Sequence, residues 1–261
     1  MISRDLAMAL DPALFMAEAG YPPDPWQATF LRSTSPRTLL LSSRQLGKST
    51  VTGALASHAA IYLPGSLILL LAPSQQQSRE LFRKVCAFHR EAADTDPEAE
   101  SAQRIELPNG SRIVSLSGNP TTVRGFSGPR LIILDEAAWI EDELFHAVTP
   151  MLAAGGRLIA MTTPNGRRGW FYDAWAGNDP AWDRTRVTAL ESPRITPEFL
   201  ALERAAKPEW RYRQEYLCEF VDTDEQLFPT DMIARAITPD VPPLFSPSAF
   251  PSFSSGAGHA T

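Results

Sequence analysis

The stretch LLLSSRQLGKST, Leu39–Thr50, decides the fold of this chain. An apolar run typical of a buried strand stops at a short polar loop, and Gly47-Lys48-Ser49 then opens a predicted helix. Backbone N–H groups of such a loop and of a helix N-terminus point at an anion, while the lysine and the serine hydroxyl reach phosphate oxygens and Mg²⁺. Ser42 stands where the G-x-x-x-x-G-K-S/T pattern has its first glycine, so an ordinary helix start is the alternative for this stretch alone.

A second apolar run, Arg130–Glu136, ends in two adjacent carboxylates. Asp135, at the end of the predicted strand, is placed to hold the Mg²⁺ hydration shell, and Glu136 is placed to polarise a water that attacks a γ-phosphate. Phosphoryl transfer depends on positioning and charge stabilisation, so a lysine, a hydroxyl, a metal-binding carboxylate and a water-orienting base suffice. The alternative is that both acids cap a helix that begins near Ala137. Together with Lys48, the pair predicts a nucleoside triphosphatase.

A third apolar run, Arg157–Thr162, also ends in small polar residues. In a parallel sheet its end lies beside the ends of the other core strands, so Thr163 or Asn165 is placed to sense a γ-phosphate. A plain strand-to-loop turn is the alternative, since Pro164-Asn165-Gly166 is good turn chemistry.

Strand and helix signals alternate along the chain, which indicates an α/β fold with a mostly parallel sheet flanked by helices. An Asn-Gly turn inside the alternating segment 104–116 predicts a hairpin, and residues 94–101 are expected to form an acidic loop. The predicted strands cover residues 38–41, 66–71, 131–136 and 157–162. The predicted helices cover residues 5–19, 25–31, 49–61, 75–91, 142–152, 169–176, 197–206 and 209–217.

The composition is that of a soluble protein with one large domain: 261 residues, 44% of them hydrophobic and 21% charged. A net charge of −6 argues against strong binding of duplex DNA by a broad basic face of one copy, so DNA contacts are expected to be local or shared by several subunits. Cys86 and Cys218 have no paired spacing and indicate neither a zinc site nor a disulfide framework. No apolar run reaches transmembrane length and no signal peptide is recognisable, which favours the cytoplasm.

Four segments together resemble the ATPase domain of the large terminase subunit of tailed bacteriophages, a family that packages double-stranded DNA into preformed capsids. They are Ser43–Ser49, Val123–Ser127, Leu131–Glu136 and Thr162–Gly166, in the family's order. The likeness extends over roughly Tyr21–Phe228, and Ser-Arg-Gln-Leu-Gly-Lys is close to the family's own variant of the phosphate loop. The resemblance implies a P-loop NTPase fold of the RecA/ASCE-like type, with ATP and Mg²⁺ bound.

The resemblance also implies roles for individual residues. Nucleotide binding falls to a glutamine at the adenine edge and to the phosphate loop, that is, to Gln27, Ser43, Arg44, Gln45, Leu46, Gly47, Lys48, Ser49 and Thr50. Mg²⁺ binding falls to Ser49 and Asp135, and catalysis falls to Glu136. The motif that couples hydrolysis to movement comprises Thr162, Thr163 and Asn165.

Two arginines compete for the role of the transition-state finger, which accelerates hydrolysis by roughly 10³–10⁵. Arg44 lies inside the phosphate loop, where it is placed to act in cis. Arg124 lies in a loop next to Gly125 and is placed to reach the site of a neighbouring subunit. The alternative for Arg124 is a structural salt bridge.

The family likeness implies double-stranded DNA, a portal protein and a small terminase subunit as partners. It also implies a homo-oligomer, a pentamer on the portal, with no membrane contact. The expected place of action is the cytoplasm of a host bacterium.

We expect three parts: N-terminal helices with the adenine-binding segment in residues 1–36, a P-loop ATPase core in 37–222, and a linker with a disordered low-complexity tail in 223–261. Residues 239–261 are rich in Pro, Ser, Phe and Gly and nearly free of charge, a composition that cannot build a core. Family members continue into a ribonuclease-H-like nuclease, which this sequence is expected to lack, as in a truncated phage or prophage product.

Two other functions stay open at this point: another nucleic-acid-translocating ATPase of the helicase type, and a catalytically silent prophage remnant. A helicase normally needs a second motor-like domain, and the sequence is expected to contain none. All candidate catalytic groups are present, which argues against an inherent loss of the chemistry.

Overall fold

A computed structural model of the chain describes residues 2–93, 96–221, 232 and 236. By its contacts the chain divides into two units, Met1–Val221 and Asp222–Thr261. The predicted linker and tail, residues 223–261, lie outside the described residues except for Met232 and Ala236. Within the described part, no helix combines the length and the apolar character that crossing a membrane requires.

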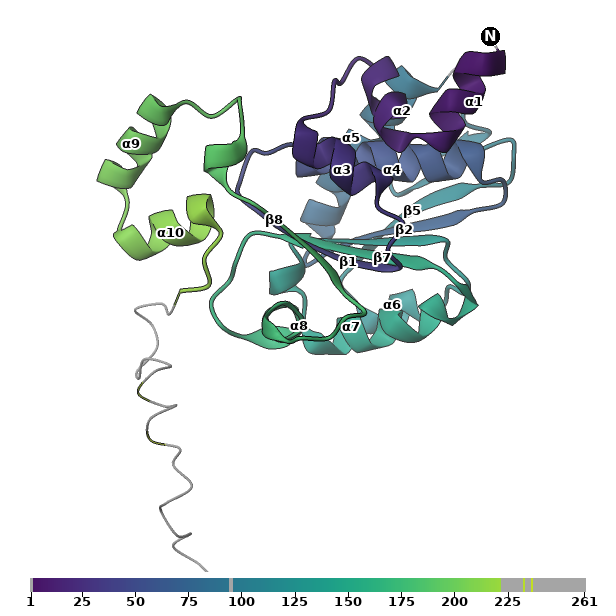
Figure 1. The fold of residues 1–261 in the computed structure, drawn as a ribbon. Helices are drawn as coiled ribbons and strands as arrows, with labels where there is room; N and C mark the ends of the chain where they lie inside the picture. The colour runs from purple at the N-terminus through teal and green to yellow at the C-terminus, as the bar shows by residue number, and fades with distance from the viewer. Residues whose placement is uncertain (1, 94–95, 222–231, 233–235, 237–261) are drawn as a thin grey trace, which may run out of the picture. The chain divides into compact units, whose positions relative to one another are not determined.

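The first unit is built on an eight-stranded sheet in the order β3-β4-β5-β2-β6-β7-β1-β8 (Figure 1). In chain order the strands are β1 (Arg37–Ser42), β2 (Leu67–Ala72), β3 (Ala99–Glu100), β4 (Arg104–Glu106), β5 (Arg112–Ser117), β6 (Leu131–Asp135), β7 (Arg157–Thr162) and β8 (Asp183–Val187). Every neighbouring pair from β5 to β8 is parallel, whereas β4 pairs antiparallel with both β3 and β5. The predicted α/β fold with a mostly parallel sheet is confirmed.

The central strands are buried on both faces, in agreement with their unbroken apolar runs. Successive side chains alternate between two hydrophobic clusters, one on each face of the sheet. Leu40 and Leu70 belong to the first cluster, whereas their neighbours Leu39 and Leu69 belong to the second, and all four are fully buried. The core therefore holds the sheet rigid beneath the ends of its strands.

Helices cover both faces of the sheet (Figure 1). One face carries α1 (Ile2–Leu10), α2 (Pro12–Glu18), α3 (Pro25–Arg32), α4 (Lys48–Tyr62) and α5 (Gln75–Ala92). The other carries α6 (Pro120–Val123), α7 (Asp142–Val148) and α8 (Gly169–Ala176). After β8, α9 (Pro197–Ala206) and α10 (Glu209–Leu217) pack on each other around a small core of their own, which contains Leu200, Tyr212 and Tyr216.

The structure differs from the sequence expectation in a few elements. The single helix predicted at 5–19 is two helices, because Asp11 accepts a hydrogen bond from the Ala13 N–H (2.9 Å) and Pro12 begins α2. The predicted helix at 142–152 ends at Val148 and continues as the 3-10 helix Thr149–Ala154. The edge strand β8 was not predicted, since its sequence DRTRV is polar, and β3 lies within the predicted acidic loop.

Candidate active site

The candidate site is a cleft of ≈ 870 Å³ at the carboxyl ends of the parallel strands. The phosphate loop (residues 43–49) and the start of α4 form one wall, the end of β6 forms another, and one side of α5 forms a third. The predicted site residues that line this cleft are Arg44, Gln45, Leu46, Gly47, Lys48, Ser49, Thr50, Asp135 and Glu136. The fold thus brings together two motifs that lie far apart in the sequence.

The phosphate loop depends on glycine at its last position before α4. Gly47 has φ +82°, the left-handed region, and a Cβ there would lie 2.8 Å from the Gln27 Nε2 atom. Any other residue would bring both backbone strain and a clash. Lys48 donates from Nζ to the Ser43 carbonyl (3.3 Å), so the lysine side chain already lies across the loop.

A bracket of side chains from distant segments fixes the loop from behind. The Leu46 carbonyl accepts hydrogen bonds from Gln27 Nε2 and from Arg194 Nη2, both at 3.2 Å. Arg194 also pairs with Asp24 (2.5 Å), and the Gln27 Oε1 atom accepts from the Asp24 N–H (2.8 Å). We call Asp24, Gln27 and Arg194 the loop bracket.

The loop bracket gives Gln27 a place that the sequence did not predict. Gln27 is fully buried, and each end of its amide is engaged with the protein. Its contact with an adenine edge stays a prediction, whereas its contact with the phosphate loop is a feature of the fold. Arg194 was missed, because a lone arginine in a loop before α9 carries no motif.

At the other end of the cleft, β6 delivers the two carboxylates. Burial and then the charge of Glu136 raise the pKa of Asp135 to about 6, and Lys48 partly offsets the rise. Glu136 has φ 49° and ψ 45°, a left-handed conformation that costs a non-glycine residue about 1–2 kcal/mol. This turn ends β6 directly after Asp135 and begins the 3-10 helix Ala137–Trp139.

The predicted coupling motif holds that turn. Thr163 Oγ1 donates to Glu136 Oε2 at 3.5 Å, the outer limit of a hydrogen bond. Thr162 Oγ1 accepts from the Ala138 N–H, and Asn165 Nδ2 donates to the Ala138 carbonyl, both at 3.2 Å. The end of β7 therefore grips the backbone next to Glu136 from both sides, which links the three predicted residues to the candidate catalytic one.

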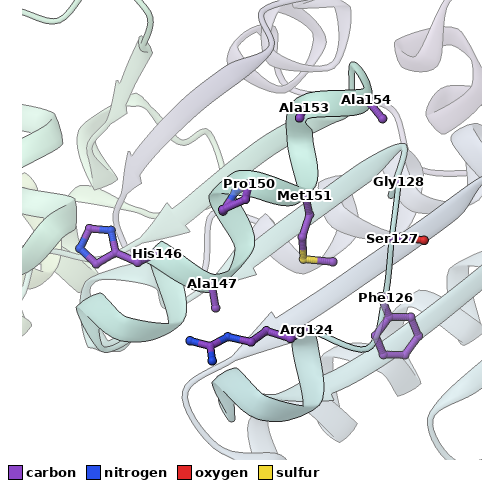
Figure 2. A pocket seen from close by; sticks show the side chains of 10 residues that line it. All are labelled: Arg124, Phe126, Ser127, Gly128, His146, Ala147, Pro150, Met151, Ala153 and Ala154. Carbon is purple, nitrogen blue, oxygen red and sulfur yellow. The ribbon is translucent and has the colours of Figure 1, made fainter.

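The two candidate arginine fingers lie in different places. Arg44 is exposed and lines the cleft. Arg124 is exposed at the end of α6 and lines a second pocket of ≈ 580 Å³, which shares no lining residue with the cleft. Figure 2 shows Arg124 beside Ala147, between His146 and Phe126. Arg124 therefore does not line the cleft of its own chain.

The sequence also left two parts of the cleft wall unassigned. Trp139 lies on the cleft, and α5 contributes a side that includes Glu80 and Lys84. Lys84 lowers the pKa of Asp135, so this lysine adds positive charge to the cleft. Helix α5 itself was predicted, but which of its faces meets a strand end depends on packing that the sequence pattern does not specify.

The cysteines are structural. Burial raises the pKa of Cys218 to about 12 and that of Cys86 to about 11, so neither thiol is ionised near neutral pH. Cys218 Sγ donates to the Val187 carbonyl (3.2 Å), which also accepts from the Ser43 N–H (3.0 Å). The end of α10 is thereby attached to the start of the phosphate loop.

Comparisons with known proteins agree with this geometry. The family "Terminase large subunit, T4likevirus-type, N-terminal" matches residues 39–235. The large terminase subunit of Thermus virus P23-45 is 25% identical over 253 residues, which cover 82% of this chain and 52% of that protein. That of Thermus phage G20c gives the same identity and coverage. The chain spans about half the length of these curated relatives.

Solved structures show the same fold. The large terminase ATPase domain of Thermus phage P74-26 has a TM-score of 0.71 at 23% identity, covering 79% of this chain and 97% of that domain. The HK97 bacteriophage large terminase has a TM-score of 0.64 at 20% identity, covering 82% of this chain and 56% of that one. The resemblance found in the sequence is confirmed by the family match over most of the chain. The chain belongs to the T4likevirus-type family of terminase large subunits and corresponds to its N-terminal part.

Proposed function

We propose that this chain is the ATP-hydrolysing motor part of a phage or prophage terminase large subunit, which drives double-stranded DNA into a capsid. The observation that supports it most is the cleft on which Lys48, Asp135 and Glu136 converge. A large terminase of a thermophilic bacteriophage, solved in complex with ATP-gamma-S, has the same fold with a TM-score of 0.65 at 12% identity, covering 77% of this chain and 53% of that one. We extend nucleotide binding from that protein to this cleft.

In the proposed reaction the phosphate loop and the N-terminus of α4 hold the phosphates of ATP. Their N–H groups and the helix dipole favour an anion at this position. Lys48 exchanges the Ser43 carbonyl for oxygens of the β- and γ-phosphates, a short move for a flexible side chain. Gly47, in its left-handed conformation, lets the loop approach the phosphates closely.

The donors near the loop fit Mg²⁺. Asp135 offers one carboxylate and Ser49 one hydroxyl, and in the described part of the chain no group of three or more acidic, histidine or cysteine residues competes for a metal. Such a sparse protein set suits Mg²⁺, which takes its remaining ligands from phosphates and water. Bound there, Mg²⁺ would offset the charge of the β- and γ-phosphates.

We assign the hydrolytic step to Glu136. Its carboxylate orients a water whose oxygen attacks the γ-phosphorus, while the bond to the β–γ bridging oxygen breaks and ADP leaves with the electron pair. The water proton passes to Glu136 or to the phosphate product. Thr163 holds the Glu136 carboxylate, and an arginine, Arg44 in cis or Arg124 from a neighbour, offsets the developing charge.

Coupling to movement is assigned to Thr162, Thr163 and Asn165. Their bonds to Glu136 and to both backbone groups of Ala138 form one connected set at the γ-phosphate end. Loss of the γ-phosphate would change the position of Glu136 and hence of the end of β7. We propose that this shift begins the movement of the DNA.

The partners follow from the same proposal. They are double-stranded DNA in an assembled ring, a portal protein and a small terminase subunit, with the chain as a homo-oligomer, a pentamer by family likeness. The proposed place of action is the cytoplasm of the host bacterium. The proposed division into N-terminal helices (1–36), ATPase core (37–222) and linker with tail (223–261) completes the account.

Steady-state ATP hydrolysis with and without duplex DNA tests this function. Glu136→Gln should reduce turnover by about 10²–10⁴, the usual contribution of a general base. Glu80→Gln is the matched control, because Glu80 also lines the cleft but pairs with Arg83 on its own helix (2.7 Å). Equal turnover of Glu136→Gln and wild type would contradict the proposed base. Stimulation by DNA supports the packaging motor, and its absence at all protein concentrations would count against it.

A further inference from the structure

Two exposed features have no role in the reaction of a single chain. One is Trp139, which is 52% exposed on the rim of the cleft, whereas Trp170 and Trp182 are buried. The other is the pocket beside Arg124. Large apolar surface of this kind marks a contact with another molecule.

The pocket is suited to an aromatic side chain. Its ≈ 580 Å³ are bordered by Phe126, Ala147, Pro150 and Met151, with Arg124 at the edge (Figure 2). Methionine adapts to the shape of a partner, and a guanidinium is attracted to the face of an indole ring. An inserted tryptophan would gain both contacts.

Trp139 and the pocket belong to different surfaces of the chain, since the cleft and the pocket share no lining residue. Two complementary surfaces in different places join copies head to tail, which generates a ring when the rotation closes. The charges agree with such a contact. The cleft side carries Glu80 and Glu136, and the pocket side carries Arg124.

We propose that the pocket beside Arg124 receives Trp139 of a second copy of this chain. Trp139 follows Glu136 by three residues, and its N–H donates to the Glu136 carbonyl (2.9 Å), so the two move as one turn. Seating Trp139 in the pocket therefore brings the neighbour's Glu136 next to Arg124. The inference rests on the proposed ATPase and assigns Arg124, over Arg44, the role of a finger acting in trans.

Two other roles for Trp139 fit less well. Stacking on the adenine is disfavoured because Trp139 lies at the Glu136 end of the cleft, whereas Gln27 and Arg194 contact the opposite side of the phosphate loop. Insertion of DNA into the pocket is disfavoured because its lining is mostly apolar and holds no lysine.

Photo-cross-linking tests the docking without relying on activity. Trp139→p-benzoylphenylalanine, irradiated at high protein concentration, should give a cross-linked dimer whose adduct maps to the peptide that contains Met151. The same replacement at Phe199, a partly exposed aromatic on α9, is the control and should not label that peptide. No dimer adduct, an adduct elsewhere on the chain, or an adduct to added DNA would overturn the proposal.

A second pair of variants separates failure of this inference from failure of the proposed function. Trp139→Ala should keep the ATP affinity of wild type and lose the part of turnover that rises with protein concentration, as should Arg124→Ala. A threefold or greater loss of ATP affinity in Trp139→Ala would favour base stacking and overturn the docking. If the Met151 adduct forms while Arg124→Ala keeps full turnover, the contact stands and the finger is wrong. If wild type shows no turnover at any concentration, the proposed ATPase fails, whatever the adduct.

Discussion

The two ends of the cleft are built in different ways. The γ-phosphate end is made by neighbouring strands, since Asp135 of β6 pairs in register with Met161 of β7, and the residues that follow each strand bond to one another. The opposite end is made by the loop bracket, whose members Asp24, Gln27 and Arg194 come from both ends of the first unit and meet at one carbonyl. The difference suggests a division of labour: one end performs the chemistry, and the other keeps the phosphate loop in shape.

Gly47→Ala should have the largest effect, because it attacks the loop directly. The new Cβ is strained by φ +82° and meets Gln27 Nε2 at 2.8 Å, so ATP affinity should fall at least tenfold and the free energy of unfolding by about 3 kcal/mol. Nucleotide titration and thermal unfolding measure both. Gly20→Ala is the control: its φ is +89°, but no atom lies within 4 Å of the new Cβ, so only the strain of about 1 kcal/mol should appear.

Asp135→Asn should stabilise the nucleotide-free chain while it abolishes Mg²⁺-dependent ATP binding. The folded pKa of about 6 lies above the ordinary 3.8, so between these pH values the folded chain holds more protons than the unfolded chain. Ionised Asp135 therefore costs stability at neutral pH, and this cost disappears as the pH falls through about 6. We expect a gain of ~2 kcal/mol at pH 7.5 that vanishes near pH 4, measured by urea unfolding.

The exposed Asp173→Asn is the control for this prediction and should leave stability unchanged. A less stable Asp135→Asn chain at pH 7.5 would mean that Asp135 is held by contacts that outweigh its burial.

The loop bracket should show coupled effects of moderate size. Gln27→Ala removes a buried donor and acceptor and should cost about 1–3 kcal/mol. Arg194→Ala, at a half-exposed position, should cost less than about 1 kcal/mol. Because both donate to the Leu46 carbonyl, the double variant should lose more than the sum of the two. Strictly additive losses in a double-mutant cycle would show that the bracket is not one unit.

Thr163→Val should have the smallest effect, on turnover alone. Its hydrogen bond to Glu136 is long at 3.5 Å, so we expect a few-fold slower hydrolysis with unchanged ATP affinity and unfolding temperature. Thr163→Ser, which keeps the hydroxyl, should restore the rate. A rate of Thr163→Val equal to wild type would remove Thr163 from the support of Glu136.

The same difference between the two ends explains what the sequence could predict. Lys48, Asp135, Glu136 and the Thr162 segment follow apolar strand runs, and parallel strands bring such ends to one edge. The loop bracket depends on contacts between segments as distant as 24 and 194, for which no periodicity exists. The polar edge strand β8 was missed because it pairs on one side only and carries no apolar run.

Single-turnover hydrolysis tests the division of labour most directly. With labelled ATP and excess protein, Gln27→Ala should bind ATP more weakly but cleave bound ATP at the wild-type rate. Glu136→Gln should bind ATP as tightly as wild type and cleave it about 10²–10⁴ times more slowly. Slow cleavage of bound ATP by Gln27→Ala, or wild-type cleavage by Glu136→Gln, would contradict the account.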